Sequence, residues 1–378
     1  MMFEFLLSHA PAAAQLGSDP FSLIYNALFY VVFIGFMLYG QRIQTMFWQR
    51  NIERALRNLE KWAGEGKDRS MKTILDKGKP TNNPKSIVDE YMEFFMIEPV
   101  DRDPAGVLGR LEHLLDVRKR YSETIVAKIA PSAGTEERAN IEVVLEAAMA
   151  LNFIYRVVRH YLILGKKTHS LFIIMQLEMQ IPLIEKLAES YYKALDAFVK
   201  GTPIGDGIGP MVASKMMEGA PKIDVPEEFV RSDIILDGRN VVILKAKGPG
   251  GRVGKPGLAV QKVVEQYNGK VAGIITIDAA LKLEGEKTGE IIQGVGVALG
   301  DPGPEKNKIE QVATDYNIPI QAVIVKQAME EAITYMKKEI VDSVDNAIVR
   351  VKEIVNDMAK AGETVIVVGI GNTLGVGQ

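Results

Sequence analysis

The sequence predicts an α/β protein in which one transmembrane helix and a helical middle domain precede a C-terminal α/β domain with a largely parallel sheet. Three observations lead to this fold class. Residues 21–40 form an apolar run without a charged side chain, and residues 86–200 repeat apolar side chains at helical spacing. After residue 201, short β-rich runs alternate with helical segments, which is typical of a sheet covered by helices.

The run FSLIYNALFYVVFIGFMLYG at 21–40 has the length of one crossing of a lipid bilayer. No Lys or Arg occurs before Arg42, whereas Arg50 and Arg54 follow closely. By the positive-inside rule, this asymmetry puts the short segment 1–20 outside the cell and the bulk of the chain in the cytoplasm. We therefore expect a single-pass protein of the cell membrane. Two alternatives remain, namely cleavage of a signal peptide in the Ala-rich stretch before the run, and a buried core helix.

The region behind the apolar run is predicted to be helical with one interruption. Residues 41–85 begin as a basic amphipathic helix and continue, from residue 63, as a polar stretch with Gly, Pro and Asn that indicates a linker. A helical domain is expected over 86–200. Within it, Asp103 followed by Pro104 is a signal for the start of a helix.

Residues 201–378 form the predicted α/β domain. A single long helix is expected over 327–361, with Ile, Val and Met recurring at spacings of three and four. This apolar stripe favours packing on the sheet, and it also allows a coiled-coil contact in a homo-oligomer. The segments expected to contribute strands include 241–246, 272–278, 290–299, 318–326 and 364–371.

Composition excludes several kinds of site. The chain has 378 residues and no cysteine, which rules out disulfides, thiol nucleophiles and cysteine-ligated metals. Its net charge of −3 gives no reason to expect a nucleic-acid partner. All four histidines lie at or before His169, so none falls in the C-terminal domain. We assign no residue to a metal, and the sequence identifies no cofactor.

Four glycine-rich stretches lie in the C-terminal domain, at 201–217, 247–257, 294–308 and 369–378. Three of them precede predicted helices, whose N-terminal amides bind anions readily. We therefore expect a pocket for a small anionic ligand, such as a nucleotide, at the carboxyl ends of the strands. The second stretch lacks the spacing of a phosphate-binding loop, but Lys255 is a cation suited to an anion. The candidate ligand-binding residues are Gly205, Gly207, Gly209, Gly248, Gly250, Gly251, Lys255, Gly300, Asp301, Gly303, Gly369, Gly371 and Asn372.

Two motifs resemble the hydrogenase-maturation endopeptidase and germination-protease group. VIVVGIGN at 365–372 is similar to the strand of that group that ends in Gly-x-Gly-Asn, and GDGIGPMVASKM at 205–216 to its acidic loop and following helix. AGIITIDAA at 272–280 resembles a later strand of the group that ends in Asp-Ala. The first two motifs occur here in reversed order, which resembles a circular permutation.

This resemblance implies that Asp206 and Asp278 share a pocket, with Asn372 beside them. Two carboxylates in such a place are suited to position a metal or to activate water, and both are candidate catalytic residues. The metal-binding members of the group also use a histidine, which this domain lacks.

The whole chain further resembles an uncharacterised archaeal family of membrane-anchored proteins, through GVGVALGDPGPEK and the terminal GIGNTLGVGQ. That resemblance implies a membrane location and no activity. Three functions therefore remain open. The first is a membrane-anchored binding module for a small anionic ligand. The second is a hydrolase or peptidase-like enzyme that uses Asp206 and Asp278. The third is a membrane scaffold that oligomerises through helix 327–361.

Overall fold

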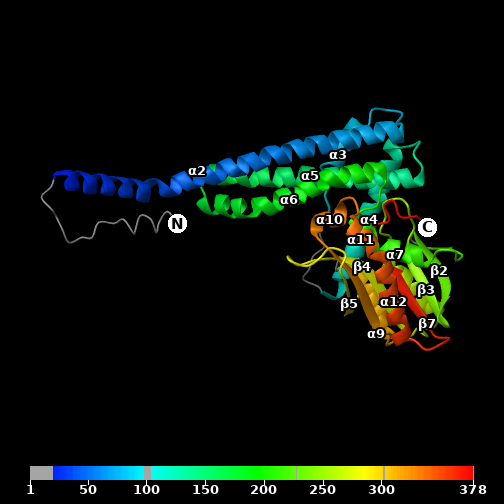
Figure 1. The fold of residues 1–378 in the computed structure, drawn as a ribbon. Coiled ribbons are helices and arrows are strands. Elements are labelled where there is room, and N and C mark those ends of the chain that lie inside the picture. The colour runs from blue at the N-terminus through cyan, green and yellow to red at the C-terminus, as the bar shows by residue number, and fades with distance from the viewer. Residues whose placement is uncertain (1–19, 98–103, 227, 301–302, 378) are drawn as a thin grey trace. The chain divides into compact units, whose positions relative to one another are not determined.

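The computed structural model describes residues 20–97, 104–226, 228–300 and 303–377 (Figure 1). Most of the predicted extracytoplasmic segment, as well as Asp103 and Asp301, lies outside the described residues. The chain divides into two compact units, residues 1–57 with 157–182 and residues 58–156 with 183–378.

The N-terminal region is helical, as predicted. Figure 1 shows the three longest helices, α2, α5 and α6, running side by side. The helical elements are α2 (Pro20–Thr73), the π-helix η1 (Ile74–Gly78), α3 (Lys85–Tyr91), α4 (Pro104–Ile129), α5 (Thr135–Thr168) and α6 (Leu171–Lys200).

The polar stretch from residue 63 is not the linker that its composition indicated. Helix α2 continues through it to Thr73, and only residues 79–84 connect to α3. Its charged side chains are exposed or partly exposed, whereas Ala63, Ser70 and Ile74 are buried. The Ser70 hydroxyl is satisfied within the helix, because it donates to the Gly66 carbonyl at 2.9 Å. Composition alone missed these buried positions.

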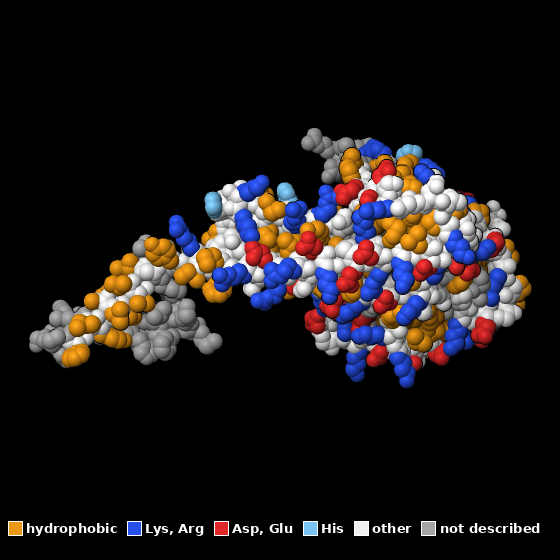
Figure 2. Space-filling model, turned by 90° about the horizontal axis from the view of Figure 1, so that it is seen from above, with side chains coloured by type: hydrophobic (Ala, Val, Ile, Leu, Met, Phe, Trp, Pro, Cys, Tyr) orange, Lys and Arg blue, Asp and Glu red, His pale blue; other side chains and the backbone are white. Residues whose placement is uncertain are grey.

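The predicted membrane span corresponds to the first part of α2. Among the described residues, no single helix is long and apolar enough to cross a membrane. Two helical stretches, Ile24–Gly35 and Tyr39–Gly78, pass that test only together, with an angle of 52° between them. Side chains of the run are exposed in the structure, including Phe21 at 81% and Val31 at 67%. Figure 2 shows hydrophobic side chains gathered along this part of the helix.

The C-terminal domain contains one seven-stranded sheet in the order β1-β2-β3-β7-β4-β6-β5. The sheet is mixed and only partly parallel, which corrects the prediction of a largely parallel sheet. Its four central strands are parallel, whereas the outer strands β1, β2 and β5 are antiparallel to their neighbours. The strands are β1 (Ile223–Val225), β2 (Phe229–Leu236), β3 (Arg239–Ala246), β4 (Gly273–Leu281), β5 (Ile291–Val295), β6 (Ile320–Gln327) and β7 (Thr364–Gly369).

Helices cover both faces of this sheet. Apolar residues of α8 (Pro256–Gln266) and α9 (Pro304–Asp315) form one core with one face of the sheet. The opposite face packs against α7 (Ile208–Met216), α11 (Lys338–Asp342) and α12 (Val344–Met358). Alternate residues of each central strand point into the two cores, as the pleat requires.

The helix expected over 327–361 is three shorter helices, α10 (Met329–Ile333), α11 and α12. The chain is extended at Thr334, and Tyr335 forms a β-bridge with Ile204, so the helix cannot continue there. The apolar stripe of this segment packs onto the sheet, with Val351 and Val355 fully buried. This agrees with the interpretation of the stripe as a core face.

Candidate functional site

The carboxyl ends of the parallel strands lie along one side of the sheet, next to the short helix η2 (Gly205–Gly207) and the start of α7. We call this side of the sheet the carboxyl edge. This close approach requires glycine. A Cβ atom on Gly209 would overlap the carbonyl oxygens of Ile277, within β4, and of Ile370, just beyond β7. A Cβ on Gly371, whose φ is +131°, would overlap the carbonyl of Asp206. Gly205, Gly207 and Gly369 have similarly close neighbours.

These contacts bring Asp206 and Asp278 to the same edge. Asp206 accepts a hydrogen bond from the Asn372 amide at Oδ2, at 2.8 Å, and is partly accessible to solvent. Asp278, only 4% exposed, accepts from the Ala279 amide at 2.7 Å. Burial raises the pKa of Asp206. Burial, and secondly the negative charge of Asp206, raise the pKa of Asp278 well above its usual value. The pKa values of both carboxyl groups are therefore raised, and the charge of Asp206 contributes to the shift of Asp278.

A polar side chain that the sequence analysis missed lies next to Gly205, the residue before Asp206. Gln327, at the end of β6, is 1% exposed, and neither its amide nitrogen nor its amide oxygen has a hydrogen-bond partner among the described residues. A Cβ on Gly205 would stand 2.5 Å from the Gln327 oxygen. A buried amide without partners is costly, so Gln327 is a polar group whose hydrogen-bonding capacity is unused in this structure. A glutamine closing the apolar strand IPIQAVIVKQ was the signal available in the sequence.

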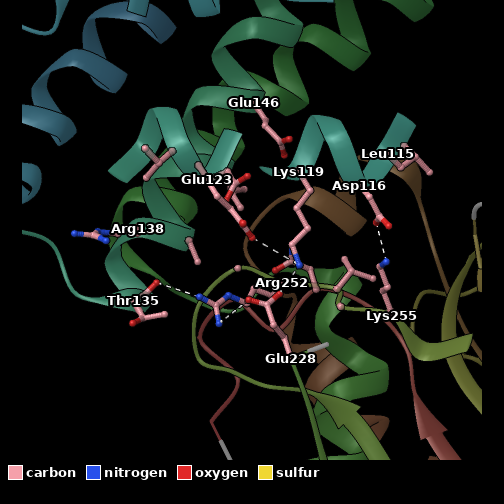
Figure 3. Close-up of a pocket in the computed structure, with 18 of the residues that line it drawn as sticks. Leu115, Asp116, Lys119, Glu123, Thr135, Arg138, Glu146, Glu228, Arg252 and Lys255 are labelled. Carbon is pink, nitrogen blue, oxygen red and sulfur yellow. Dashed lines mark hydrogen bonds and ion pairs between the residues drawn. The ribbon is translucent and has the colours of Figure 1, made fainter. Parts of the chain in front are cut away.

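A cavity of about 630 Å³ lies next to the carboxyl edge (Figure 3). It is lined by α4, α5, the loop between β3 and α8, the start of α9, and Asn372. Asn372 therefore belongs to both places, because its amide contacts Asp206. The cavity size falls within the range of small-molecule sites. Apolar side chains such as Leu115, Val126 and Val143 supply part of the wall.

We call the loop between β3 and α8, in the glycine-rich stretch 247–257, the glycine loop. Its cations Arg252 and Lys255 are already paired with carboxylates. Lys255 lies 2.7 Å from Asp116 of α4. Arg252 lies 3.2 Å from Glu228, which also accepts from Lys119 at 2.9 Å. Figure 3 shows these side chains pointing toward one another from α4 and from the loop. An anion at Lys255 would have to replace the Asp116 carboxylate.

Seven carboxylates and four Lys or Arg line the cavity, so its wall is acidic on balance. Two of the carboxylates lie on α5 and are half-buried. Burial raises the pKa of Glu142, although a hydrogen bond from Ser122 opposes the shift. Burial also raises the pKa of Glu146, against the attraction of Arg118 at 3.3 Å. These carboxyl groups would ionise more easily beside an added positive charge.

The predicted ligand-binding glycines separate into groups. Gly251 and Lys255 line the cavity with Asn372, and the Gly251 amide donates to Asn140 Oδ1 at 3.0 Å. Gly248 and Gly250 instead pack closely against other parts of the chain. This close packing explains why glycine occurs at both positions, and no ligand is needed to account for it. Gly303 precedes α9, and Gly300 ends the segment before the undescribed Asp301. The acidic residues of α4 and α5 were missed, because nothing local in the sequence links them to the loop. In the described part of the chain, no group of three or more His, Asp or Glu side chains is arranged to hold a metal ion.

The fold and site define a two-part protein, in which a helical region precedes an α/β domain with a cavity beside its carboxyl edge. The chain belongs to the DUF1512 family. Residues 26–201 match the model described as a protein of unknown function (DUF1512) N-terminal domain. Residues 204–377 match the model described as domain of unknown function (DUF1512) C-terminal. No curated protein matches the chain.

Proposed function

We propose that the protein is a membrane-anchored binding module whose cavity holds a small molecule. The observation that carries this proposal is the cavity of about 630 Å³, with mixed apolar and charged walls, between α4, α5 and the glycine loop. The uncharged run at 21–40, most of whose described side chains are exposed, supports the anchor, with the basic residues after it on the cytoplasmic side.

The ligand that best suits this wall carries a positive charge on an apolar body. The loop cations are neutralised by Glu228 and Asp116, whereas Glu142 and Glu146 have carboxyl groups that burial makes reluctant to ionise. A cation beside them would favour their ionised forms and release protons. An anion, expected from the glycine loops, is the competing ligand and would have to displace Asp116.

The test is calorimetric titration of the full chain with spermidine and choline, and with inorganic phosphate and ATP. We expect an organic cation to bind more tightly at pH about 7 than at pH about 5, because Glu142 and Glu146 release protons on binding. Titration in buffers of different ionisation enthalpy measures that release. Glu142→Gln should weaken binding, whereas the exposed Glu310→Gln is the matched control.

Other outcomes would redirect the proposal. Binding of phosphate or ATP that is lost in Lys255→Ala would identify the anion as the ligand class. The same four probes are also tested by thermal unfolding, because a ligand at about 100 times its dissociation constant stabilises a fold by about 2.7 kcal/mol. Absence of both binding heat and a thermal shift with all four would favour the membrane scaffold as the function.

A second function, hydrolysis at the carboxyl edge, is supported by the charge coupling between Asp206 and Asp278. A pair that retains one proton supplies an acid and a base in one place. The ionised carboxylate would take a proton from water as the water attacks a carbonyl, and the protonated partner would give its proton to the leaving group. The resemblance to the endopeptidase group supports this alternative, since residues from its two separated motifs are in contact through Asn372.

The residues here do not fit the metal that some members of that group hold. Two carboxylates and the Gln327 amide are available, and no histidine lies in this domain. We therefore derive no step through a metal. The test is hydrolysis of a mixed peptide library by the full chain. Asp206→Asn and Asp278→Asn should each abolish it, whereas Asp224→Asn, at an exposed side chain, should not. Hydrolysis retained in both site variants would exclude this function.

A further inference from the structure

The register between α2 and α6 places the turn between α5 and α6 close to the end of the apolar run. Asn51 donates to Glu178 at 2.9 Å, and Asn58 donates to Glu185 at 3.0 Å. Both pairs are 127 residues apart, so the two helices run parallel in constant register. Leu171, the first residue of α6, is therefore level with Gln44.

The end of α5 reaches the same level. A Cβ on Gly165 would stand 2.6 Å from Ile174 Cδ1, so the last turns of α5 pack against the first turn of α6. From the end of the apolar run at residue 40 to Gln44, the helix rises about 6 Å. That distance is comparable with the headgroup layer on one side of a bilayer. A bilayer around 21–40 would therefore have its headgroups at the level of this turn.

The turn has the side chains that such a layer accommodates. Phe172 is 65% exposed and Leu171 37%, although both are apolar. Lys166, Lys167 and His169 lie beside them and are exposed. Aromatic and apolar side chains next to lysines are typical of segments that insert shallowly into a membrane surface.

The positive charge of the compact unit that contains the anchor and the turn indicates that it contacts an anionic surface. Its described residues, 20–57 and 157–182, contain seven Lys or Arg and two Glu, whereas the whole chain has a net charge of −3. Figure 2 shows Lys and Arg side chains directly beyond the hydrophobic part of α2. Clusters of cations at the cytoplasmic end of a membrane span bind anionic lipids. Continuity with the apolar run favours a lipid surface over an acidic protein.

We infer that the α5–α6 turn, residues 166–172, is a second membrane contact that inserts Phe172 among anionic lipid headgroups. This contact rests on the proposed anchor at 21–40. It holds the helical unit against the bilayer at two separate points of the chain. A single helix would leave the unit free to rotate about the anchor, whereas two contacts fix which face of α5 and α6 is turned toward the lipid.

The absence of cysteine allows a direct test with single labels on the full chain. An environment-sensitive fluorophore is attached to Val32→Cys, Phe172→Cys or Tyr316→Cys, all exposed positions. Each variant is reconstituted in phosphatidylcholine vesicles, with and without phosphatidylglycerol. Quenching by spin-labelled lipid is compared with quenching by aqueous iodide.

We expect lipid quenching at positions 32 and 172, with the signal at 172 stronger when phosphatidylglycerol is present and weaker at high salt. Position 316, in the C-terminal domain, should respond only to iodide. Lys167→Glu should reduce lipid quenching at 172 and leave that at 32 unchanged, whereas Lys270→Glu should change neither. Lipid quenching at 32 together with only iodide quenching at 172 overturns the second contact and leaves the anchor. Only iodide quenching at 32 overturns both.

Discussion

We expect the buried ammonium group of Lys245 to lower the free energy of unfolding of the C-terminal domain at neutral pH. It lies near the carboxyl end of β3 and is fully buried, and its Nζ donates to the Ala246 carbonyl at 3.1 Å. Burial, and secondly repulsion by Lys222, lower its pKa from 10.5 to about 8. In the unfolded chain the group keeps its higher pKa and binds the proton more tightly. The folded state therefore carries a penalty below pH 8, which disappears as the pH rises through 10.5.

The size of the free-energy penalty follows from the pKa shift of Lys245. Each pKa unit corresponds to about 1.4 kcal/mol, so the charged Lys245 costs about 3 kcal/mol at pH about 7. Lys245→Met has a similar volume and removes the charge. We expect it to increase the free energy of unfolding of the C-terminal domain by about 3 kcal/mol at pH about 7, and by much less at pH about 10.

Pulse proteolysis of the full chain in urea, at both pH values, measures this difference. The matched control is Lys270→Met, at an exposed lysine, which should change stability little. A Lys245→Met variant that is less stable than the parent at pH about 7 would refute the reasoning, because it would mean that the ammonium group is stabilised where it lies. An equal gain at both pH values would attribute the effect to packing instead of charge.

Two further substitutions test the carboxyl edge. Gly209→Ala should destabilise the C-terminal domain by about 1–3 kcal/mol, because its Cβ would overlap two backbone carbonyls, whereas Gly64→Ala, in an open helical position, should stabilise by about 0.5–1 kcal/mol. Thermal unfolding checks both, and a neutral Gly209→Ala would mean that α7 does not need this close approach. Asp278→Asn should stabilise the domain at pH about 7. The folded carboxyl has the higher pKa, so its ionisation costs stability as the pH rises through that range, and the gain should vanish at pH about 3. Unfolding at both pH values checks this, and a gain that persists at low pH would contradict it.

Helix starts were the most predictable part of the fold. Pro256 and Pro304 each lie within a glycine-rich stretch, and each begins a helix that covers the sheet. The buried strand at 364–371 was equally visible, because six consecutive residues of β7 are buried and read as an unbroken apolar run. In these segments the local preference and the tertiary environment point the same way.

Contacts between distant segments could not be predicted from local pattern. The hairpin of β2 and β3 was missed in part, because β2 mixes polar and apolar side chains and lacks the continuous buried apolar run of β3. The break after α10 depends on the bridge between Ile204 and Tyr335, which are far apart in sequence. An apolar period continues through that break, so the sequence predicted one helix where three exist.

The same reason explains why the acidic residues of the cavity wall were not predicted from the sequence. In the sequence, Lys255 is a cation suited to an anion, whereas its partner in the structure, Asp116, belongs to a helix of the preceding region. Likewise, Glu142 and Glu146 are ordinary polar positions of an amphipathic helix until the fold puts them on a cavity wall. A sequence shows which side chains a segment has, but the net charge of a pocket wall also depends on the distant segments that pack around the same cavity.

The order of the strands makes the carboxyl edge dependent on the whole C-terminal domain. β7 is the last strand along the chain, yet it lies between β3 and β4 at the centre of the sheet. Asn372, three residues beyond its end, donates its backbone amide to Asp206 and also lines the cavity. The two aspartates can therefore be neighbours only after the final strand has inserted between strands that precede it by about a hundred residues. The edge and the cavity therefore both depend on the position of the final strand and of Asn372, which follows it.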